Sequence, residues 1–209
     1  VFARGTHRRG EVLRRALRYQ VAWERSRARY LFLLHNDMLF HGDLLGAMLA
    51  RVHGHIAIGP VGQCWNCSAR RAGACSPGTF MSYRPSYAEW LRLCAEHPGA
   101  RAEQYGRIVD PQRPWPLPEC RVNEWAALVD LSIARPATLP FGPAIPLGAQ
   151  HGLDIGTAWF HDVVNAGHAI SHFDITPYAT HAWASASRAG RPALFDRAHD
   201  LGVEVVLDV

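Results

Sequence analysis

The chain has 209 residues, of which 48% are hydrophobic, and its net charge is +4. Such a composition is typical of a globular protein with a sizeable core, and the length indicates a single domain over residues 1–209. Every apolar stretch is shorter than the roughly 18–20 residues of a membrane-spanning helix. The arginine-rich start contains no apolar segment of the kind found in secretory signals. We therefore expect a cytoplasmic protein, either fully soluble or peripheral to the membrane.

The charge is concentrated at the start of the chain. Residues 1–29 hold nine arginines against Glu11 and Glu24, and the whole chain contains no lysine. A basic segment can face nucleic acid, a lipid surface or a phosphorylated substrate, or it can be the solvated face of a helix. No nucleic-acid-binding motif with standard spacing accompanies it, so no nucleic-acid partner is expected.

Apolar periodicity and capping residues divide the chain into alternating helices and strands. Helices are predicted at 10–28, 43–52 (with Asp43 as N-cap), 87–97, 154–166 and 193–201, and strands at 30–34, 55–61, 168–175 and 203–207. The apolar segment 122–133 fits either a strand or a helix, and long irregular loops are predicted at 62–85, 98–118 and 136–148. This order predicts an α/β fold with a mostly parallel central sheet flanked by helices, and long loops of this kind usually carry function.

The most informative motif follows the strand at 30–34. His35, Asn36 and Asp37 stand at the carboxyl end of this short apolar strand, which is the edge where ligands bind in open α/β sheets. A hard divalent cation bound to diphosphate oxygens needs only one or two protein carboxylates. The motif therefore predicts a metal and diphosphate site, with a capped loop beside a core strand as the plainer alternative.

The segments YLFLLHND and GDLLGAML resemble the centre of glycosyltransferase family 2, nucleotide-sugar transferases with the Rossmann-like GT-A fold. The resemblance implies that Asp37 is the last carboxylate of a D-x-D-like motif that binds Mn²⁺ or Mg²⁺ on the donor diphosphate. His35 replaces the usual first aspartate, and imidazole suits Mn²⁺ better than Mg²⁺. The family pattern also assigns Asp154 as catalytic base and His181 as third metal ligand. Taken alone, Asp154 is equally an N-cap, and His181 equally a surface or core histidine.

The implied activity is inverting transfer of a sugar from a nucleotide-sugar donor to the hydroxyl of a glycan, lipid or small-molecule acceptor. The resemblance covers about 5–60 and 150–185, but the family's first strands have no counterpart before 30–34. We therefore expect an N-terminally truncated copy, or one whose nucleotide-base pocket comes from another chain, with self-association through the open sheet edge. Asn36 and Trp159 are the expected substrate contacts, since aromatic faces suit sugar rings; core packing is the commoner role of such a tryptophan.

Five cysteines in a chain with no export signal argue against a disulfide framework. Cys64 and Cys67 form a C-x₂-C pair, the commonest half of a structural zinc site. The other half would come from Cys75 with Cys120, or Cys75 with His53 or His55, none of them at standard spacing. Free thiols are the alternative. If zinc is bound, the rival function is a non-catalytic zinc-stabilised binding domain that grips nucleic acid through its arginine-rich start.

Overall fold

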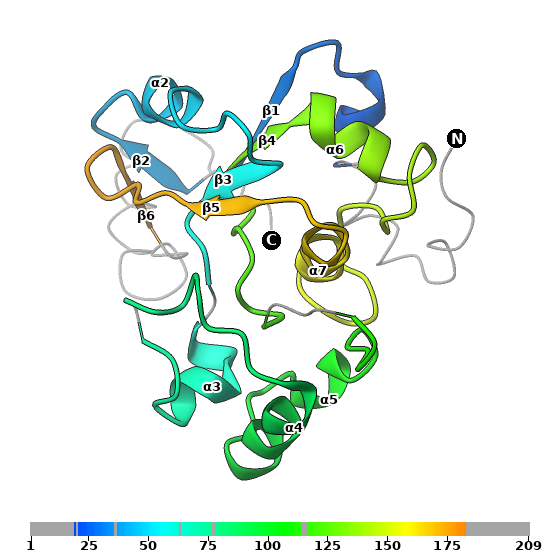
Figure 1. Cartoon of the computed structure of the whole chain (residues 1–209). Coiled ribbons are helices and arrows are strands. Elements are labelled where there is room, and N and C mark those ends of the chain that lie inside the picture. The colour runs from blue at the N-terminus through cyan, green and yellow to red at the C-terminus, as the bar shows by residue number, and fades with distance from the viewer. Residues whose placement is uncertain are drawn as a thin grey trace, which may run out of the picture.

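The computed structural model describes residues 19, 21–35, 37–62, 64–76, 78–113 and 117–182 (Figure 1). The strands are β1 (Tyr30–Leu34), β2 (Met38–Phe40), β3 (Ala57–Gly59), β4 (Ala126–Asp130), β5 (Ile170–His172) and β6 (Ala179–His181). The helices are α2 (Leu44–Leu49), the 3₁₀ helix η2 (Cys64–Asn66), α3 (Ser68–Arg71), α4 (Tyr87–Glu96), α5 (Ala102–Tyr105), α6 (Leu131–Ala137) and α7 (Thr157–Asn165). Residues 21–25 are also helical. The elements predicted at 193–201 and 203–207, and most of 10–28, lie outside the described residues.

The central sheet is mixed, so the prediction of a mostly parallel sheet is wrong although the α/β class is confirmed. Its strand order is β1-β4-β3-β5, with β4 antiparallel to both neighbours and β3 parallel to β5. The reason lies in the connection from β3 to β4. Val61 and Val122 form an antiparallel bridge just beyond the strands, so the chain re-enters the sheet at the edge where β3 left it. A strand that enters from that edge must run against β3.

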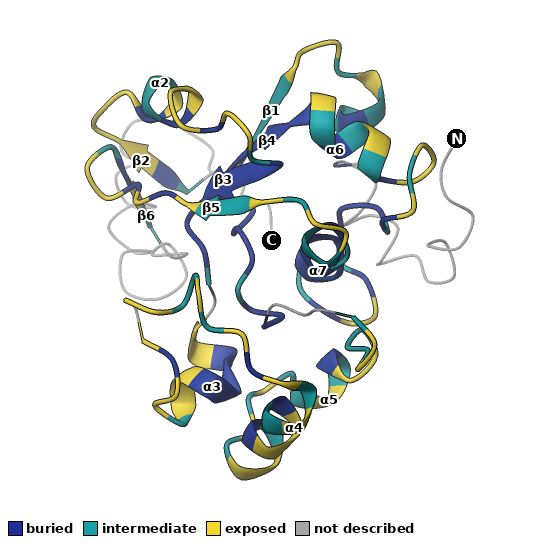
Figure 2. Ribbon diagram, viewed as in Figure 1, coloured by how far each residue is buried: buried dark blue, intermediate teal, exposed yellow. Residues whose placement is uncertain are grey.

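Side chains along each strand point alternately to the two faces of the sheet, and both faces are covered by a hydrophobic core. Ala127 and Val129 of β4 face a core that includes the tryptophan pair Trp23 and Trp159, whose rings meet edge to face at 5.3 Å. Leu128 faces the opposite core, with Met48 of α2. All five residues of β4 are buried (Figure 2), as the middle strand of a doubly covered sheet requires.

Residues 60–125 form an excursion beyond the ends of β1 and β3, and this part contains η2, α3, α4 and α5 (Figure 1). It has a small core of its own around Trp90, Leu93 and Tyr105. The loop predicted at 62–85 therefore contains two helical turns, which are too short to produce an apolar period. The helix predicted at 87–97 is confirmed as α4, and the Ser86 side chain caps it by accepting a hydrogen bond from Glu89 N.

Other local predictions are confirmed with small shifts. The strand at 30–34 is β1, and Asp43 caps α2 through a 2.8 Å hydrogen bond from Gly46 N to Oδ1. The ambiguous segment 122–133 contains both structures, since β4 ends at Asp130 and α6 begins at the next residue. The short strands β2 and β6 were not predicted, and within the part of the chain that the structure describes they form a separate two-stranded sheet.

Candidate metal centre

The small sheet of β2 and β6 brings two distant parts of the chain together at the end of β1. Met38 lies opposite His181 in the antiparallel register, and Ala182 N donates to Asp37 O at 2.9 Å. The backbone of Asp37 is therefore fixed beside the strand that carries His181. On the other side, His35 N donates to Trp125 O at 3.2 Å, which ties the end of β1 to the start of β4.

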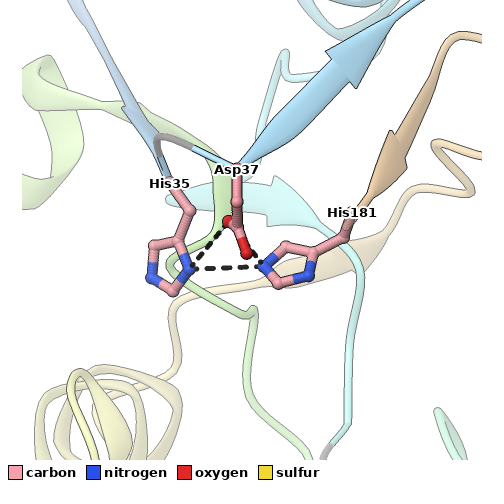
Figure 3. Close-up of side chains that lie close together, drawn as sticks. All are labelled: His35, Asp37 and His181. Carbon is pink, nitrogen blue, oxygen red and sulfur yellow. Dashed lines mark hydrogen bonds and ion pairs between the residues drawn. The ribbon is translucent and has the colours of Figure 1, made fainter. Parts of the chain in front are cut away.

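Three side chains converge at this point: His35, Asp37 and His181, hereafter the His–Asp–His triad (Figure 3). Their ligand atoms all lie within 4.8 Å of one another. His181 Nε2 is 3.3 Å from Asp37 Oδ1, and His35 Nδ1 is 3.9 Å from the same oxygen. The two imidazoles approach each other at 3.3 Å between His181 Nε2 and His35 Nδ1. Two ring nitrogens and one carboxylate oxygen aimed at a common point form a donor set that divalent cations accept.

The surroundings favour the neutral form of His181. Burial lowers the pKa of His181 below its ordinary value, and His35 lowers it further, while Asp37 and Glu124 oppose this shift. Its side chain is 8% exposed, and the Trp125 ring packs against it edge to face at 4.8 Å. Neutral imidazole is the form that binds metal ions. Asp37 and His35 keep more exposure, 28% and 35% of their side chains, so the triad can be reached from solvent.

A series of ion pairs leads from the triad into the protein. His35 Nε2 lies 3.8 Å from Glu124 Oε1, and Glu124 Oε2 accepts from Arg121 Nη1 at 3.0 Å. Arg121 Nη2 in turn donates to Asp154 Oδ2 at 3.2 Å. We call the residues joined in this way the ionic chain: Glu124, Arg121, Asp154, Arg101 and Glu119. Arg121 and Glu124 are 1% and 7% exposed, so water screens this ion pair little, whereas Asp154 is 28% exposed.

Asp154 is not the N-cap of α7. That position is Gly156, which has a φ of 81° and makes no side-chain capping bond. Asp154 Oδ2 instead accepts from both Arg101 and Arg121, at 3.2 Å each, and Oδ1 accepts from Ile155 N at 2.9 Å. Its side chain remains 28% exposed. The N-cap role that the sequence allowed for Asp154 therefore does not apply. Asp154 is instead connected to the triad through the side chains of Arg121 and Glu124.

The expected sugar contact at Trp159 is wrong. Its side chain has no exposed surface, packs against Trp23 and Phe160, and donates Nε1–H to Thr138 Oγ1 at 2.8 Å. The ring fills the core beneath the sheet and offers no face to a ligand. The other predicted contact, Asn36, lies outside the described residues.

The four cysteines named for zinc lie in one region but do not form a second group like the triad. Among the described residues, the triad is the group of three or more ligand side chains whose atoms lie within 4.8 Å of one another. Cys67 and Cys75 are buried in the small core of the excursion, and Cys120 packs against it. His53 and His55 precede β3 while Cys64 and Cys67 follow it; His53 is exposed and His55 is half-buried.

Arg121, Arg101 and Glu124 were not identified as site residues from the sequence. The available signal was a polar segment, Glu119 to Glu124, directly before an apolar strand. Burial gives this segment unusual properties: it raises the pKa of Glu119 to about 7, against the opposing effect of Arg121 and Arg101.

Comparison of the chain with protein-family models, with curated proteins and with solved structures found no match. In the part of the chain that the structure describes, no helix combines the length and apolar character needed to cross a membrane.

Proposed function

We propose that this chain is a metal-dependent glycosyltransferase that moves a sugar from a nucleotide-sugar donor to an acceptor hydroxyl with inversion. The observation that carries the proposal is the His–Asp–His triad at the carboxyl end of β1. Its ligands come from residues 35, 37 and 181, yet their atoms lie within 4.8 Å of one another. A chance surface cluster would not require a dedicated pair of short strands to assemble it.

The type of donor set favours a diphosphate ligand. One carboxylate and two imidazoles satisfy about half of the six positions around Mn²⁺, and phosphate oxygens with water suit the remainder. A bound cation would stabilise the negative charge that develops on the leaving diphosphate. Within the protein, Trp125 and Glu124 support His181 and His35 from behind, as the partners of metal-binding histidines commonly do.

Asp154 is proposed as the general base. Inverting transfer requires the acceptor oxygen to attack the anomeric carbon as the carbon–oxygen bond to the diphosphate breaks, while the acceptor proton passes to a carboxylate. Oδ2 accepts hydrogen bonds from two guanidinium groups, which hold the carboxylate in a fixed position. Oδ1 accepts from Ile155 N, so the backbone also helps to orient the carboxylate.

The proposal is tested by calorimetric titration of a panel of nucleotide sugars in the presence and absence of Mn²⁺. The wild type is expected to bind at least one donor only when Mn²⁺ is present. Asp37→Ala should weaken this binding by more than roughly 100-fold, because changes to groups behind metal ligands alone cost about 10- to 100-fold.

Asp43→Ala is the matched control. This carboxylate lies six positions along the chain, caps α2 and takes no part in the triad. The Asp43→Ala variant should therefore retain Mn²⁺-dependent donor binding. Equal donor affinity in the wild type and Asp37→Ala, or donor binding that ignores Mn²⁺, would contradict the proposal.

A further inference from the structure

Four of the five cysteines gather beyond the end of β3, away from the triad. We call Cys64, Cys67, Cys75 and Cys120 the cysteine cluster. Three segments of the excursion bring them together. Cys67 N donates to Cys64 O at 3.2 Å, which closes the turn of the C-x₂-C pair, and Cys75 N returns to Ala69 O at 3.2 Å.

The remaining member arrives on a different segment. Gly62 N donates to Arg121 O at 3.0 Å, so the residues before Cys64 run beside the residues around Cys120. Gly62 has a φ of 100°, and a Cβ there would lie 3.2 Å from Cys64 Sγ and 3.9 Å from Glu119 O. Cys120 Sγ itself contacts Phe80 O at 3.9 Å. Glycine thus permits a close approach of the two segments at the cluster.

Cys67 and Cys75 are buried in the small core of the excursion, and Cys120 packs against the same core. Burial raises the pKa of Cys67 to about 11, with smaller increases from Cys64 and Cys75. Burial also raises the pKa of Cys120, and each of the other three thiols of the cluster adds to that shift. Two arginines act in the opposite direction, Arg70 on Cys64 and Arg84 on Cys120. The fifth cysteine, Cys94, has no such coupling: its pKa is raised by burial and lowered by Ser68.

We propose that the cysteine cluster binds one structural zinc ion. Four sulfur ligands form the closed tetrahedral set that Zn²⁺ prefers, and each thiol that binds gives up its proton to solvent. The resulting centre carries a charge of −2, which Arg70 and Arg84 are placed to offset. This proposal does not rest on the proposed transferase activity, because the cysteine cluster shares no ligand with the triad.

The sulfurs must still converge on the ion. No three of them lie within 4.8 Å of one another, whereas the sulfurs of a tetrahedral site with Zn–S bonds of about 2.3 Å are separated by about 3.8 Å. The cysteine side chains must therefore move when the ion binds, and rotation about χ1 between staggered positions moves a sulfur by about 3 Å. The expected effect is structural. The described residues of the excursion form short helices and loops, and a zinc ion would join three of its segments.

Metal analysis of the full chain, purified without chelator, tests the site. We expect about one zinc per chain in the wild type and in Asp37→Ala, which removes a ligand of the triad but none of the cluster. Cys67→Ser should reduce the zinc content to near zero. Cys64→Ser, at an exposed cysteine, provides a second variant if Cys67→Ser does not fold. Cys94→Ser is the matched control and should keep the zinc.

Replacement by Co²⁺ identifies the ligands directly, because cobalt bound to thiolates has strong sulfur-to-metal charge-transfer absorption that imidazole and carboxylate do not produce. The wild type and Cys94→Ser should show this absorption, and the cluster variants should lose it. Absence of both zinc and cobalt–thiolate absorption in the wild type would overturn the proposal. A disulfide within the cluster, or equal zinc loss in Cys94→Ser, would do the same.

Discussion

The His–Asp–His triad and the cysteine cluster lie beyond the same edge of the sheet but differ in ligand chemistry and exposure. The triad offers nitrogen and oxygen atoms, and its His35 and Asp37 side chains are 35% and 28% exposed. The cluster offers sulfur; its Cys67 and Cys75 are 7% and 4% exposed, while Cys64 lies at the surface. Catalytic metal sites keep a coordination position open to substrate or water, whereas in structural metal sites protein ligands fill every position. The comparison therefore separates a proposed reaction centre from a proposed structural element.

A physical connection joins the two regions. Cys120 is followed by Arg121, whose guanidinium holds Glu124 beside the triad and Asp154 at the head of α7. Movement of the segment that carries Cys120 would therefore change the position of Arg121. We therefore expect the geometry of the proposed reaction centre to depend, through the ionic chain, on the order of the excursion.

The largest effect is expected from Asp154→Asn, which keeps the shape of the side chain but removes its ability to take a proton. Transfer should fall by about 10²- to 10⁴-fold while Mn²⁺-dependent donor binding is retained. Steady-state kinetics measures the transfer rate, and calorimetry measures donor binding. Asp162→Asn is the control, since this aspartate also pairs with an arginine, Arg113, but is not part of the ionic chain. Wild-type rates in Asp154→Asn would show that Asp154 has only a structural role.

Arg121→Met cuts the connection between the two regions. It leaves two carboxylates without their buried partner, so the free energy of unfolding should fall by about 3–5 kcal/mol in urea titrations. The control is Arg92→Met, which removes an exposed pair with Glu96 and should change the stability by less than about 1 kcal/mol. Equal stability of the two variants would mean that the ionic chain contributes nothing.

The sequence predicted the local parts of this architecture better than the long-range ones. β1 and the polar residues after it follow from an apolar run that ends in charged groups, and the cap at Asp43 follows from residue type alone. His181 could be paired with Asp37 only through a family resemblance, because β2 and β6 have three residues each and produce no periodic signal.

The errors have an equally physical origin. Trp159 looked like a sugar contact because exposure cannot be read from a single aromatic residue, and it is part of the core. Arg121 was overlooked because a buried arginine is unusual, and only its two carboxylate partners explain its position.

A smaller effect on stability is expected from Glu119, a member of the ionic chain. Glu119 precedes Cys120 of the cysteine cluster in the chain, and its charge raises the pKa of Cys64. Burial raises the pKa of Glu119 from 4.5 to about 7, so the folded protein holds this proton more tightly than the unfolded chain. The resulting stabilisation is complete below about pH 4.5 and is lost as the pH rises through 7.

Glu119→Gln mimics the protonated side chain at all pH values. It should be more stable than the wild type by about 1–3 kcal/mol at pH 8, with little difference at pH 5. Urea titrations at both pH values make the comparison, and Glu96→Gln on the exposed face of α4 should show no such dependence. A Glu119→Gln variant less stable than the wild type at pH 8 would mean that the ionised carboxylate is stabilising there.

The central claim is that His35, Asp37 and His181 bind one divalent cation, and pulsed electron paramagnetic resonance of added Mn²⁺ tests it most directly. The account predicts one Mn²⁺ per chain with nitrogen couplings from two imidazoles, reduced to one in His181→Gln. A His41→Gln control, at an exposed histidine next to β2, should leave both couplings in place. Mn²⁺ that does not bind, or that binds without nitrogen coupling, would contradict the account.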